Sequence, residues 1–358
     1  MTPKLQKFKQ IIDSFANNNI LCIGDIMLDE YIIGATERIS PEAPVPVVRH
    51  LQTKQVLGGV GNVAANLTAI GCQASAFYVI GSDAAGQQLT KMLQQQNVSA
   101  YPHKLGHLTT TKQRIIAQKQ QVCRVDYEEK LTLQKQQEDK IIYQLSRLLP
   151  QHNVVILSDY NKGLLSPRLT QAVIQMANKY HIPVLIDPKG QDYRKYQGAT
   201  LIKPNLGELK TAVSTLRPDF TTLNSMKSDG SLNIPEIQFM SNLLRKTLGI
   251  EQTVVTLGEN GMVGSSDKDI YRPTTAKDVS DVSGAGDTSL ALLAASLGTH
   301  AHLETAIDLA NIAAGVVVAK EGTATLSKEE LNLAVKNFLQ AQGPHPHSHK
   351  APHYIRNL

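Results

Sequence analysis

The stretch of this sequence that could do the most specific chemistry is "DVSGAGDTSL", residues 281–290. Its small residues, Gly284, Ala285 and Gly286, leave room for a ligand to approach the backbone. The apolar residues that follow recur at helical spacing, so a helix is predicted to begin here, and the free amides and dipole of a helix N-terminus favour a bound anion. Asp287, in the same turn, would then accept a proton beside that anion. Capping of the helix is the alternative interpretation.

Apolar runs alternate with segments of helical length along the chain. The runs are continuous rather than alternating, which predicts strands buried on both faces, in a parallel sheet between helices. They comprise residues 20–25, 74–81, 153–159, 182–187, 200–204 and 252–258. Ligands of such sheets bind at the carboxyl ends of the strands. The polar or flexible residues at these ends are Asp25, Asp159, Asp187 and Gly258, although Asp and Gly also begin ordinary loops.

Two segments interrupt this alternation. Residues 31–57 and 109–127 mix polar with β-branched residues and contain no helical pattern. They predict a small antiparallel sheet inserted into the main domain, as a lid over a site or as a surface for a second subunit. Residues 1–340 are therefore expected to form one α/β domain, and the His- and Pro-rich residues 341–358 a flexible tail.

Composition narrows the class of protein. The net charge of +5, from 36 Lys plus Arg and 31 Asp plus Glu, is mild, and there is no Trp and only 6 Phe, so no nucleic-acid partner is expected. The longest apolar run, residues 312–319, is too short to cross a bilayer, so no membrane partner is expected. Cys22, Cys72 and Cys123 form no CxxC pair. This pattern is typical of free thiols in a reducing compartment and predicts a cytoplasmic protein.

A glycine-rich motif precedes a second predicted helix. No GxxxxGK[ST] motif occurs, so the common P-loop is absent. The segment "GGVGNVAANL", residues 58–67, contains the spacing of a dinucleotide-binding turn, but the residues before it are polar and follow the inserted sheet. The alternative is a turn where the backbone and Asn62 approach a sugar closely.

Three motifs together resemble those of the ribokinase-like (PfkB) carbohydrate kinases. They are "DVSGAGDT", "GGVGNVAANLTAIG" and "KPNLGE" (residues 203–208), and the resemblance covers about residues 20–335. It implies a three-layer α/β sandwich with a mostly parallel sheet, and phosphoryl transfer from ATP, with Mg²⁺ and optionally K⁺, to a sugar hydroxyl.

Other segments resemble the subgroup that phosphorylates D-glycero-β-D-manno-heptose 7-phosphate on the route to ADP-heptose and lipopolysaccharide. These are residues 24–48, 157–163 and 310–327. The resemblance implies the β anomer as substrate and a 1,7-bisphosphate product. A homodimer joined through the lids is expected separately, because the inserted strands would expose strand edges and an apolar face. No HxGH nucleotidyltransferase motif follows residue 340, so the stand-alone form of this kinase is expected. A kinase of another sugar, a NAD-binding oxidoreductase and a non-catalytic sugar sensor are the alternative hypotheses.

The family motifs also imply roles for individual residues. Asp287 would be the general base, with the amides around Gly284, Ala285 and Gly286 holding the γ-phosphate. Asp281 and Ser283, with the segment 322–324, resemble a monovalent-cation loop. Glu208 would act on Mg²⁺ through water, although Asn205 and Glu208 also have capping-box spacing. The complete expected nucleotide set is Asn205, Leu206, Gly207, Glu208, Thr256, Gly258, Gly261 and Asn311.

The sugar side is expected to combine oxygen acceptors with cations. Carboxylates accept hydrogen bonds from vicinal hydroxyls, and cationic side chains bind a phosphate that the sugar already carries. The expected set is Asp25, Asp29, Gly58, Gly59, Asn62, Arg38, Lys112, Arg114 and Lys162. A single cation of this kind is more often a solvated surface charge than a ligand contact.

Overall fold

The computed structural model describes residues 3–220, 225–276, 278–320, 322 and 324–341. The tail predicted from residue 341 onward lies, apart from Ala341, outside these residues. Among the helices in the described ranges, none is long and apolar enough to cross a membrane.

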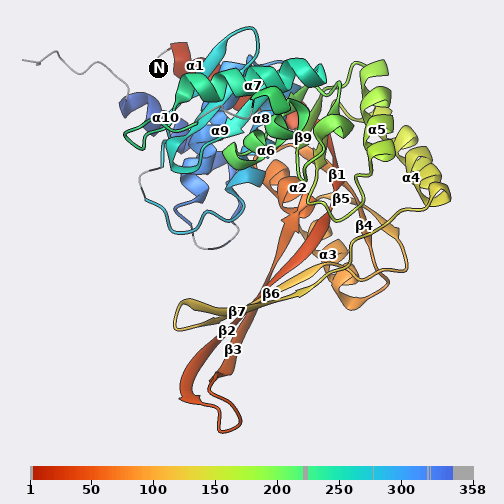
Figure 1. Cartoon of the computed structure of the whole chain (residues 1–358), viewed down its shortest axis with the longest axis vertical. Helices are drawn as coiled ribbons and strands as arrows, with labels where there is room; N and C mark the ends of the chain where they lie inside the picture. The colour runs from red at the N-terminus through yellow and green to blue at the C-terminus, as the bar shows by residue number, and fades with distance from the viewer. Residues whose placement is uncertain (1–2, 221–224, 277, 321, 323, 342–358) are drawn as a thin grey trace, which may run out of the picture.

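The centre of the described chain is a nine-stranded sheet in the order β13-β12-β11-β10-β9-β8-β1-β4-β5 (Figure 1). The strands from β11 to β5 are parallel, and β12 and β13 add antiparallel at one edge. The predicted mostly parallel sheet is therefore confirmed. The bounds are β1 Asn19–Gly24, β4 Gln73–Ile80, β5 Ser99–Lys104, β8 Val154–Ser158, β9 Val184–Asp187, β10 Leu201–Ile202, β11 Gln252–Thr256, β12 Met262–Ser265 and β13 Asp269–Arg272.

Helices cover both faces of this sheet because its central strands are apolar on both sides. In β1, Ile20 and Cys22 pack into one core, whereas Leu21 and Ile23 pack into the other. This arrangement confirms the three-layer sandwich.

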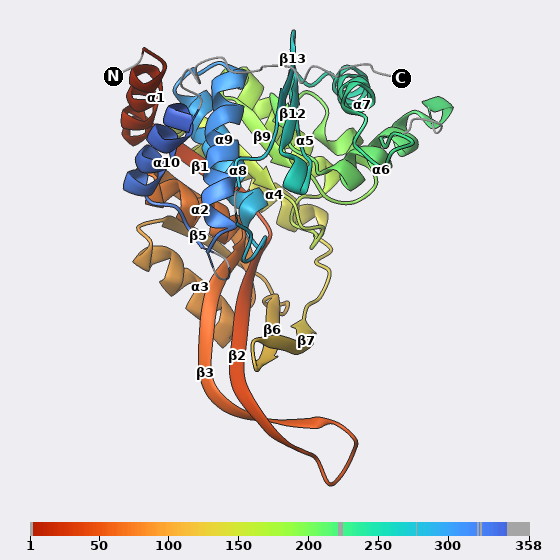
Figure 2. The same cartoon turned by 90° about the vertical axis from the view of Figure 1, so that its left-hand side faces the viewer.

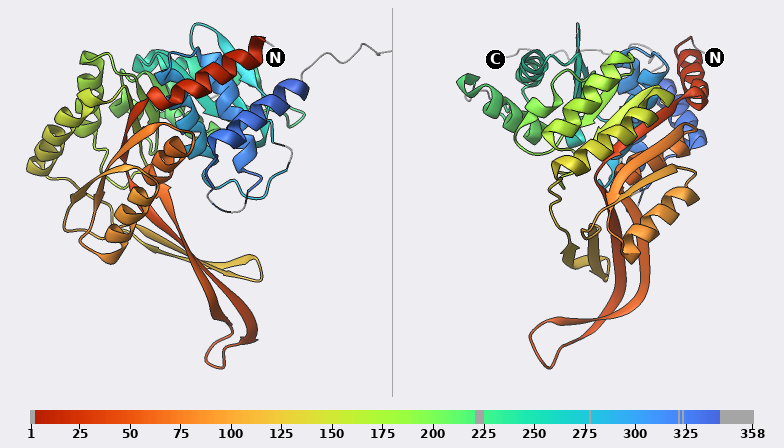
Figure 3. Two further views of the ribbon diagram at one scale, coloured as in Figure 1. Left: turned by 180° about the vertical axis from the view of Figure 1, so that it is seen from behind. Right: turned by 90° about the vertical axis from the view of Figure 1, so that its right-hand side faces the viewer.

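The first helical layer contains α1 (Pro3–Ser14), α2 (Val60–Ala69), α3 (Ala84–Gln95), α8 (Ala285–Gly298), α9 (Leu303–Val317) and α10 (Lys328–Ala341). The second contains α4 (Lys135–Leu148), α5 (Pro167–Lys179), α6 (Leu206–Leu216) and α7 (Ile234–Leu248). Short 3-10 helices lie at Phe15–Asn17, Leu149–Gln151, Tyr193–Tyr196, Pro218–Phe220 and Gly258–Asn260. Helices α1 and α10, from the two ends of the described chain, pack side by side (Figure 3).

A second sheet projects from the body of the molecule (Figure 2). Its strands are β2 (Ile26–Ile39), β3 (Pro46–Gly59), β6 (Thr111–Ala117) and β7 (Gln120–Tyr127), in the order β3-β2-β6-β7. This is the predicted inserted sheet, with one difference: β2 pairs with β6 in parallel. Both strands leave the body in the same direction, so only the two hairpins, β2–β3 and β6–β7, can be antiparallel.

The long β2–β3 hairpin is continuous with the body at both of its ends. Only Asp25 separates β1 from β2, and β3 ends at Gly59 directly before α2. The amide of Val60 donates a hydrogen bond to the carbonyl oxygen of Asp25 at 3.0 Å, which ties the two ends together. The hairpin therefore begins and ends beside the carboxyl end of β1.

Candidate active site

Acidic residues gather at the carboxyl ends of three neighbouring strands. Asp25 follows β1, Asp159 follows β8 and Asp187 ends β9. The strands pair in register, and the Asp159 amide donates to the Asp187 carbonyl oxygen at 3.0 Å. The edge of the sheet predicted to hold a ligand therefore combines several carboxylates.

The Asp287 side chain is buried between two donors from other parts of the chain. The amide nitrogen of Asn62, from α2, donates to Oδ2 at 2.7 Å, and the hydroxyl of Tyr160 donates to Oδ1 at 2.9 Å. Capping therefore does not describe this residue, because both carboxylate oxygens accept bonds from distant side chains. Burial raises the pKa of Asp287 to about 6, with a further contribution from Asp187, against the two hydrogen bonds and Lys203. Asp287 is therefore mostly ionised at neutral pH and can accept a proton.

The turn before Asp287 has the features of an anion site. Gly284, the N-cap of α8, has a φ of 82°, in the left-handed region that glycine adopts most readily. Gly286 does not share this conformation, since its φ is not positive. A Cβ added at Gly286 would lie 3.7 Å from the Lys203 ammonium. A buried cation therefore faces the first amides of the helix.

Sequence reasoning missed Lys203 and Tyr160 as site residues. Lys203 is 3% exposed and pairs with Asp187 at 3.0 Å. Lys203 is the first residue of the "KPNLGE" motif. The signal that could have identified it as a site residue is a lysine next to a strand that ends in an acidic residue. Tyr160 lies in "LSDYNKG", where nothing local indicates that its hydroxyl contacts α8.

Asp25 is a second buried carboxylate in the arrangement. Its carboxylate is buried and accepts bonds from the amides of Tyr160 at 2.9 Å, Lys162 at 3.0 Å and Leu164 at 3.4 Å. Burial raises the pKa of Asp25 to about 6, with Asp159 adding to the effect and the three amides opposing it.

The paired glycines at the end of the hairpin, Gly58 and Gly59, allow neighbouring segments of the chain to approach each other closely. A Cβ at Gly59, whose φ is 59°, would lie 2.3 Å from the Asp25 carbonyl oxygen. A Cβ at Gly58 would lie 2.4 Å from Oδ2 of Asp29. The motif thus joins β3 of the small sheet to α2, whereas a dinucleotide-binding turn would follow a strand of the central sheet.

Three of the four predicted cations lie near Asp29, at the base of the small sheet. Arg114 donates to Oδ1 of Asp29 at 2.5 Å, and Lys162 pairs with Glu128 at 2.5 Å. Burial and the charge of Lys162 lower the pKa of Lys112, so these two ammonium groups lie close enough to repel each other.

Arg38 does not join this cluster. It is exposed near the far end of β2, in register with Val47. Nine residues of extended strand separate it from Asp29, which corresponds to roughly 30 Å. Within one chain the structure therefore does not bring Arg38 to this cluster, because its strand runs outward beyond the body.

The "NLGE" motif forms a capping box at the start of α6. Oδ1 of Asn205 accepts from the Glu208 amide, and Oε2 of Glu208 accepts from the Asn205 amide, both at 2.9 Å. Oε1 of Glu208 accepts from Lys189 at 2.8 Å. Leu206 and Gly207 form the first turn between them. The capping box, the alternative interpretation of Asn205 and Glu208, is therefore present. The Glu208 carboxylate nevertheless lies at the edge of the sheet.

The other predicted nucleotide residues lie near the edge of the sheet where β11 ends. Thr256 ends β11 and forms a parallel bridge with Asn205. Gly258 and Gly261 have φ values of 60° and 90°, and a Cβ at Gly261 would lie 2.0 Å from the Arg272 carbonyl oxygen. Asn311, in α9, donates to the Pro273 carbonyl oxygen at 2.6 Å, so its side chain holds the segment after β13.

The expected monovalent-cation loop is partly described. Oδ1 of Asp281 accepts from the Ser283 amide at 2.8 Å, and the Asp281 amide donates to Val318 at 3.1 Å. Thr323 lies outside the described residues. Over the described ranges, no three His, Cys, Asp or Glu side chains converge to hold a metal ion.

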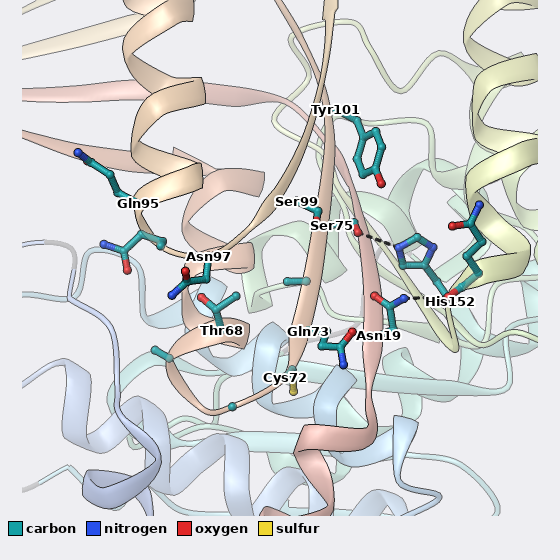
Figure 4. A pocket seen from close by; sticks show the side chains of 15 residues that line it. Asn19, Thr68, Cys72, Gln73, Ser75, Gln95, Asn97, Ser99, Tyr101 and His152 are labelled. Atoms are coloured by element: carbon teal, nitrogen blue, oxygen red, sulfur yellow. Dashed lines mark hydrogen bonds between the residues drawn. The ribbon is translucent and has the colours of Figure 1, made fainter.

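A separate cavity lies at the opposite edge of the sheet, where strands begin (Figure 4). Its volume is about 520 Å³, and amides and hydroxyls line much of it. His152 contacts the Ser75 hydroxyl there at 2.9 Å. The described residues around this cavity include no predicted site residue and no Asp, Glu, Lys or Arg, so it is distinct from the candidate active site.

Comparisons with known proteins find similar sequences over most of the chain. The family described as "pfkB family carbohydrate kinase" matches residues 17–330. The bifunctional protein HldE of a Nitratiruptor species is 42% identical over 312 residues, which are 87% of this chain and 64% of that protein. HldE of Trichlorobacter lovleyi is 41% identical over 319 residues, 88% of this chain and 62% of that protein. The chain thus spans slightly less than two thirds of these relatives.

Solved structures of low identity share the fold. Phosphofructokinase-2 from Escherichia coli in complex with potassium superposes with a TM-score of 0.73 at 18% identity, covering 90% of this chain and 99% of that one. Ribokinase from Thermotoga maritima gives a TM-score of 0.67 at 17% identity, covering 89% of this chain and 100% of that one.

Proposed function

The chain belongs to the pfkB family of carbohydrate kinases, phosphotransferases with a hydroxyl acceptor, and from this membership we propose that it phosphorylates D-glycero-β-D-manno-heptose 7-phosphate at C1, using ATP. The product is the 1,7-bisphosphate, an intermediate on the route to ADP-heptose and lipopolysaccharide. The observation that carries the proposal is the buried carboxylate of Asp287 next to a helix N-terminus that faces the Lys203 ammonium. The choice of sugar rests on the resemblance of residues 24–48, 157–163 and 310–327 to heptose 7-phosphate kinases.

Asp287 is the general base of this proposal. It accepts the proton of the C1 hydroxyl while the hydroxyl oxygen forms a bond to the γ-phosphorus. The bond from that phosphorus to the oxygen bridging to the β-phosphate breaks, and ADP leaves. With a pKa of about 6, Asp287 is ionised at pH 7. This pKa is also close enough to neutral pH for the carboxylate to accept the proton.

The backbone at Gly284, Ala285 and Gly286, with Lys203, stabilises the charge on the transferring phosphoryl group. Amide donors and an ammonium fixed before the reaction need no rearrangement as charge develops. Lys203 is oriented by its 3.0 Å pair with Asp187.

The sugar lies between Asp287 and the base of the small sheet. Asp25, Asp29 and Asn62, with the backbone of Gly58 and Gly59, bind its ring hydroxyls. The 7-phosphate binds among three cations, Lys112, Arg114 and Lys162. Because these cations gather around Asp29 at the base of the small sheet, a phosphate held among them would direct the opposite end of the sugar, C1, toward Asp287.

ATP lies along the edge formed by α6, β11 and α9. Residues Asn205 to Glu208, with Thr256, Gly258 and Gly261, contact the phosphates and ribose, and Asn311 lies at the adenine end. Glu208 would hold Mg²⁺, which when bound would supply positive charge to the ATP phosphates. Asp281 and Ser283 supply oxygens for K⁺, an ion present in one structural neighbour.

The active form is a homodimer joined through the small sheets. Apolar side chains are exposed along this sheet, and exposed strand edges and apolar faces favour pairing with another copy. They are Ile39, Val45, Leu51, Val122, Val125 and Tyr127.

The test is the conversion of ATP to ADP against a panel of sugars and sugar phosphates. Heptose 7-phosphate should give the highest kcat/KM, and phosphorus NMR should place the new phosphate on C1. Transfer to another carbon, or preference for ribose, fructose phosphates or adenosine, would refute the substrate assignment. Binding of both ligands without ADP formation would refute the kinase assignment for this chain.

A further inference from the structure

Tyr160 contacts both of the carboxylates on which the proposed mechanism depends. Its backbone amide donates to Oδ2 of Asp25 at 2.9 Å, and its hydroxyl donates to Oδ1 of Asp287 at 2.9 Å. The first carboxylate faces the sugar and the second accepts the proton. One residue therefore fixes the position of the base relative to the substrate-binding side.

The loop that carries Tyr160 is held from several directions. Before Tyr160, the Asp159 carboxylate is 2% exposed, pairs with the Lys195 ammonium and accepts from the Tyr196 hydroxyl at 2.7 Å. After Tyr160, the Lys162 carbonyl oxygen accepts from the Leu131 amide at 2.8 Å. The backbone of Tyr160 is thus fixed on both sides, and the bond from its hydroxyl to Asp287 holds the end of its side chain.

The Tyr160 hydroxyl acts as a donor over the whole working range of pH. Burial, followed by the charges of Asp287 and Asp187, raises the pKa of Tyr160 well above its usual value. Asn62 supplies the second donor, to the other oxygen of Asp287. Each oxygen of the base therefore has one fixed partner, which sets the plane of the carboxylate and leaves one lone pair on each oxygen for the sugar hydroxyl.

We propose that Tyr160 is a positioning residue for phosphoryl transfer: its hydroxyl orients the Asp287 carboxylate and favours the ionised form of this base. The inference rests on the proposed role of Asp287. The other groups that face this carboxylate are Asp187 from β9, which opposes ionisation, and Lys203 and Asn62, which favour it. When the Tyr160 hydroxyl is lost, one fewer hydrogen-bond donor stabilises the ionised Asp287 against repulsion from Asp187.

The direct test is Tyr160→Phe, with Tyr78→Phe as the matched control. Tyr78 is fully buried and bonded to the Thr90 hydroxyl at 3.0 Å in the body of the protein, so the control also removes a buried phenol hydroxyl. In Tyr160→Phe we expect kcat to fall about tenfold, and the acid limb of kcat/KM to move up by about one pH unit. The control should leave the limb in place. A Tyr160→Phe protein with normal thermal stability and an unmoved limb would overturn the inference.

A second measurement needs neither substrate nor the Tyr160 variant. In protein labelled at the aspartate γ-carbon and the tyrosine ζ-carbon, Asp287→Asn identifies the Asp287 resonance. The ζ-carbon resonance of one tyrosine should shift with pH with the same midpoint as the Asp287 resonance. Protonation of Asp287 removes the charged acceptor of that tyrosine's hydroxyl. Absence of such a tyrosine would overturn the inference. If the wild-type protein fails to phosphorylate heptose 7-phosphate, the proposed substrate falls, whereas this titration still decides the role of Tyr160.

Discussion

Replacing Asp287 by Asn should remove activity and increase stability at the same time. An asparagine has nearly the same shape, and its carbonyl oxygen can still accept from Asn62 while its amide donates to the Tyr160 oxygen. The variant cannot accept the proton, so turnover should fall by about two to four orders of magnitude. Binding of ATP, which uses other residues, should change little.

The stability effect follows from the pKa of Asp287. Folding raises this pKa from 3.8 to about 6, so the folded protein holds the proton more tightly than the unfolded chain does. Above pH 6 the ionised carboxylate therefore destabilises the folded state by roughly 3 kcal/mol relative to its neutral form. The difference shrinks as the pH falls from 6 toward 3.8, and it disappears well below pH 3.8, where the carboxyl group is neutral in both states. Asp287→Asn should thus melt about 4 °C higher than wild type at pH 7.5, with most of this gain lost near pH 4.

The assay combines ADP release, calorimetric ATP binding and thermal melting at the two pH values. Asp267→Asn is the control, because Asp267 is exposed in the β12–β13 turn and should affect neither quantity. Turnover within tenfold of wild type would show that Asp287 is not the base. A variant that loses stability together with activity would show that the substitution damaged the pocket. It would also show that ionised Asp287 does not destabilise the folded state as argued above.

Three further predictions concern the phosphate sites and the assembly. Gly284→Ala should weaken ATP binding and slow turnover, because Gly284 has a φ of 82°. Gly286→Val should have the same effect by obstructing the site, whereas Gly286→Ala should be tolerated. Calorimetry that gives equal ATP affinities for wild type, Gly284→Ala and Gly286→Val would contradict this prediction. Lys162→Met should raise KM for the sugar phosphate by about ten- to a hundredfold but leave KM for ATP unchanged in steady-state assays. Light scattering at micromolar concentration should show a dimer that Val122→Lys with Val125→Lys dissociates, and a wild-type monomer would refute the lid interface.

The central sheet was predictable because its signal is local. Segments such as 153–159 and 182–187 are buried on both faces and therefore read as continuous apolar runs. The strands β5, β12 and β13 escaped prediction, since "SAYPHK" is polar with a proline and the other two have only four residues each. Such edge strands form because a neighbour is already in place, which a local pattern does not report.

The site was predictable where a motif carried the chemistry and unpredictable where the contact is distant. Asp287 and Asp25 stand in motifs, and the structure buries both at one edge of the sheet. Tyr160 lies 127 positions from Asp287, so only the fold brings them together. Arg38 lies away from the other predicted cations for the converse reason, because a nearby position in sequence is a distant one along an extended hairpin.

The connection between β1 and the projecting hairpin has a mechanical consequence. The β2–β3 hairpin is joined to the body without an intervening loop: a single residue, Asp25, connects β1 to β2, and β3 ends at Gly59 directly before α2. Swinging of the hairpin must therefore be absorbed by backbone torsions at these two residues, which the 3.0 Å hydrogen bond from Val60 to Asp25 holds together. The carboxylate proposed to hold the sugar thus sits on the pivot itself, so a change of hairpin angle would turn Asp25 relative to the base.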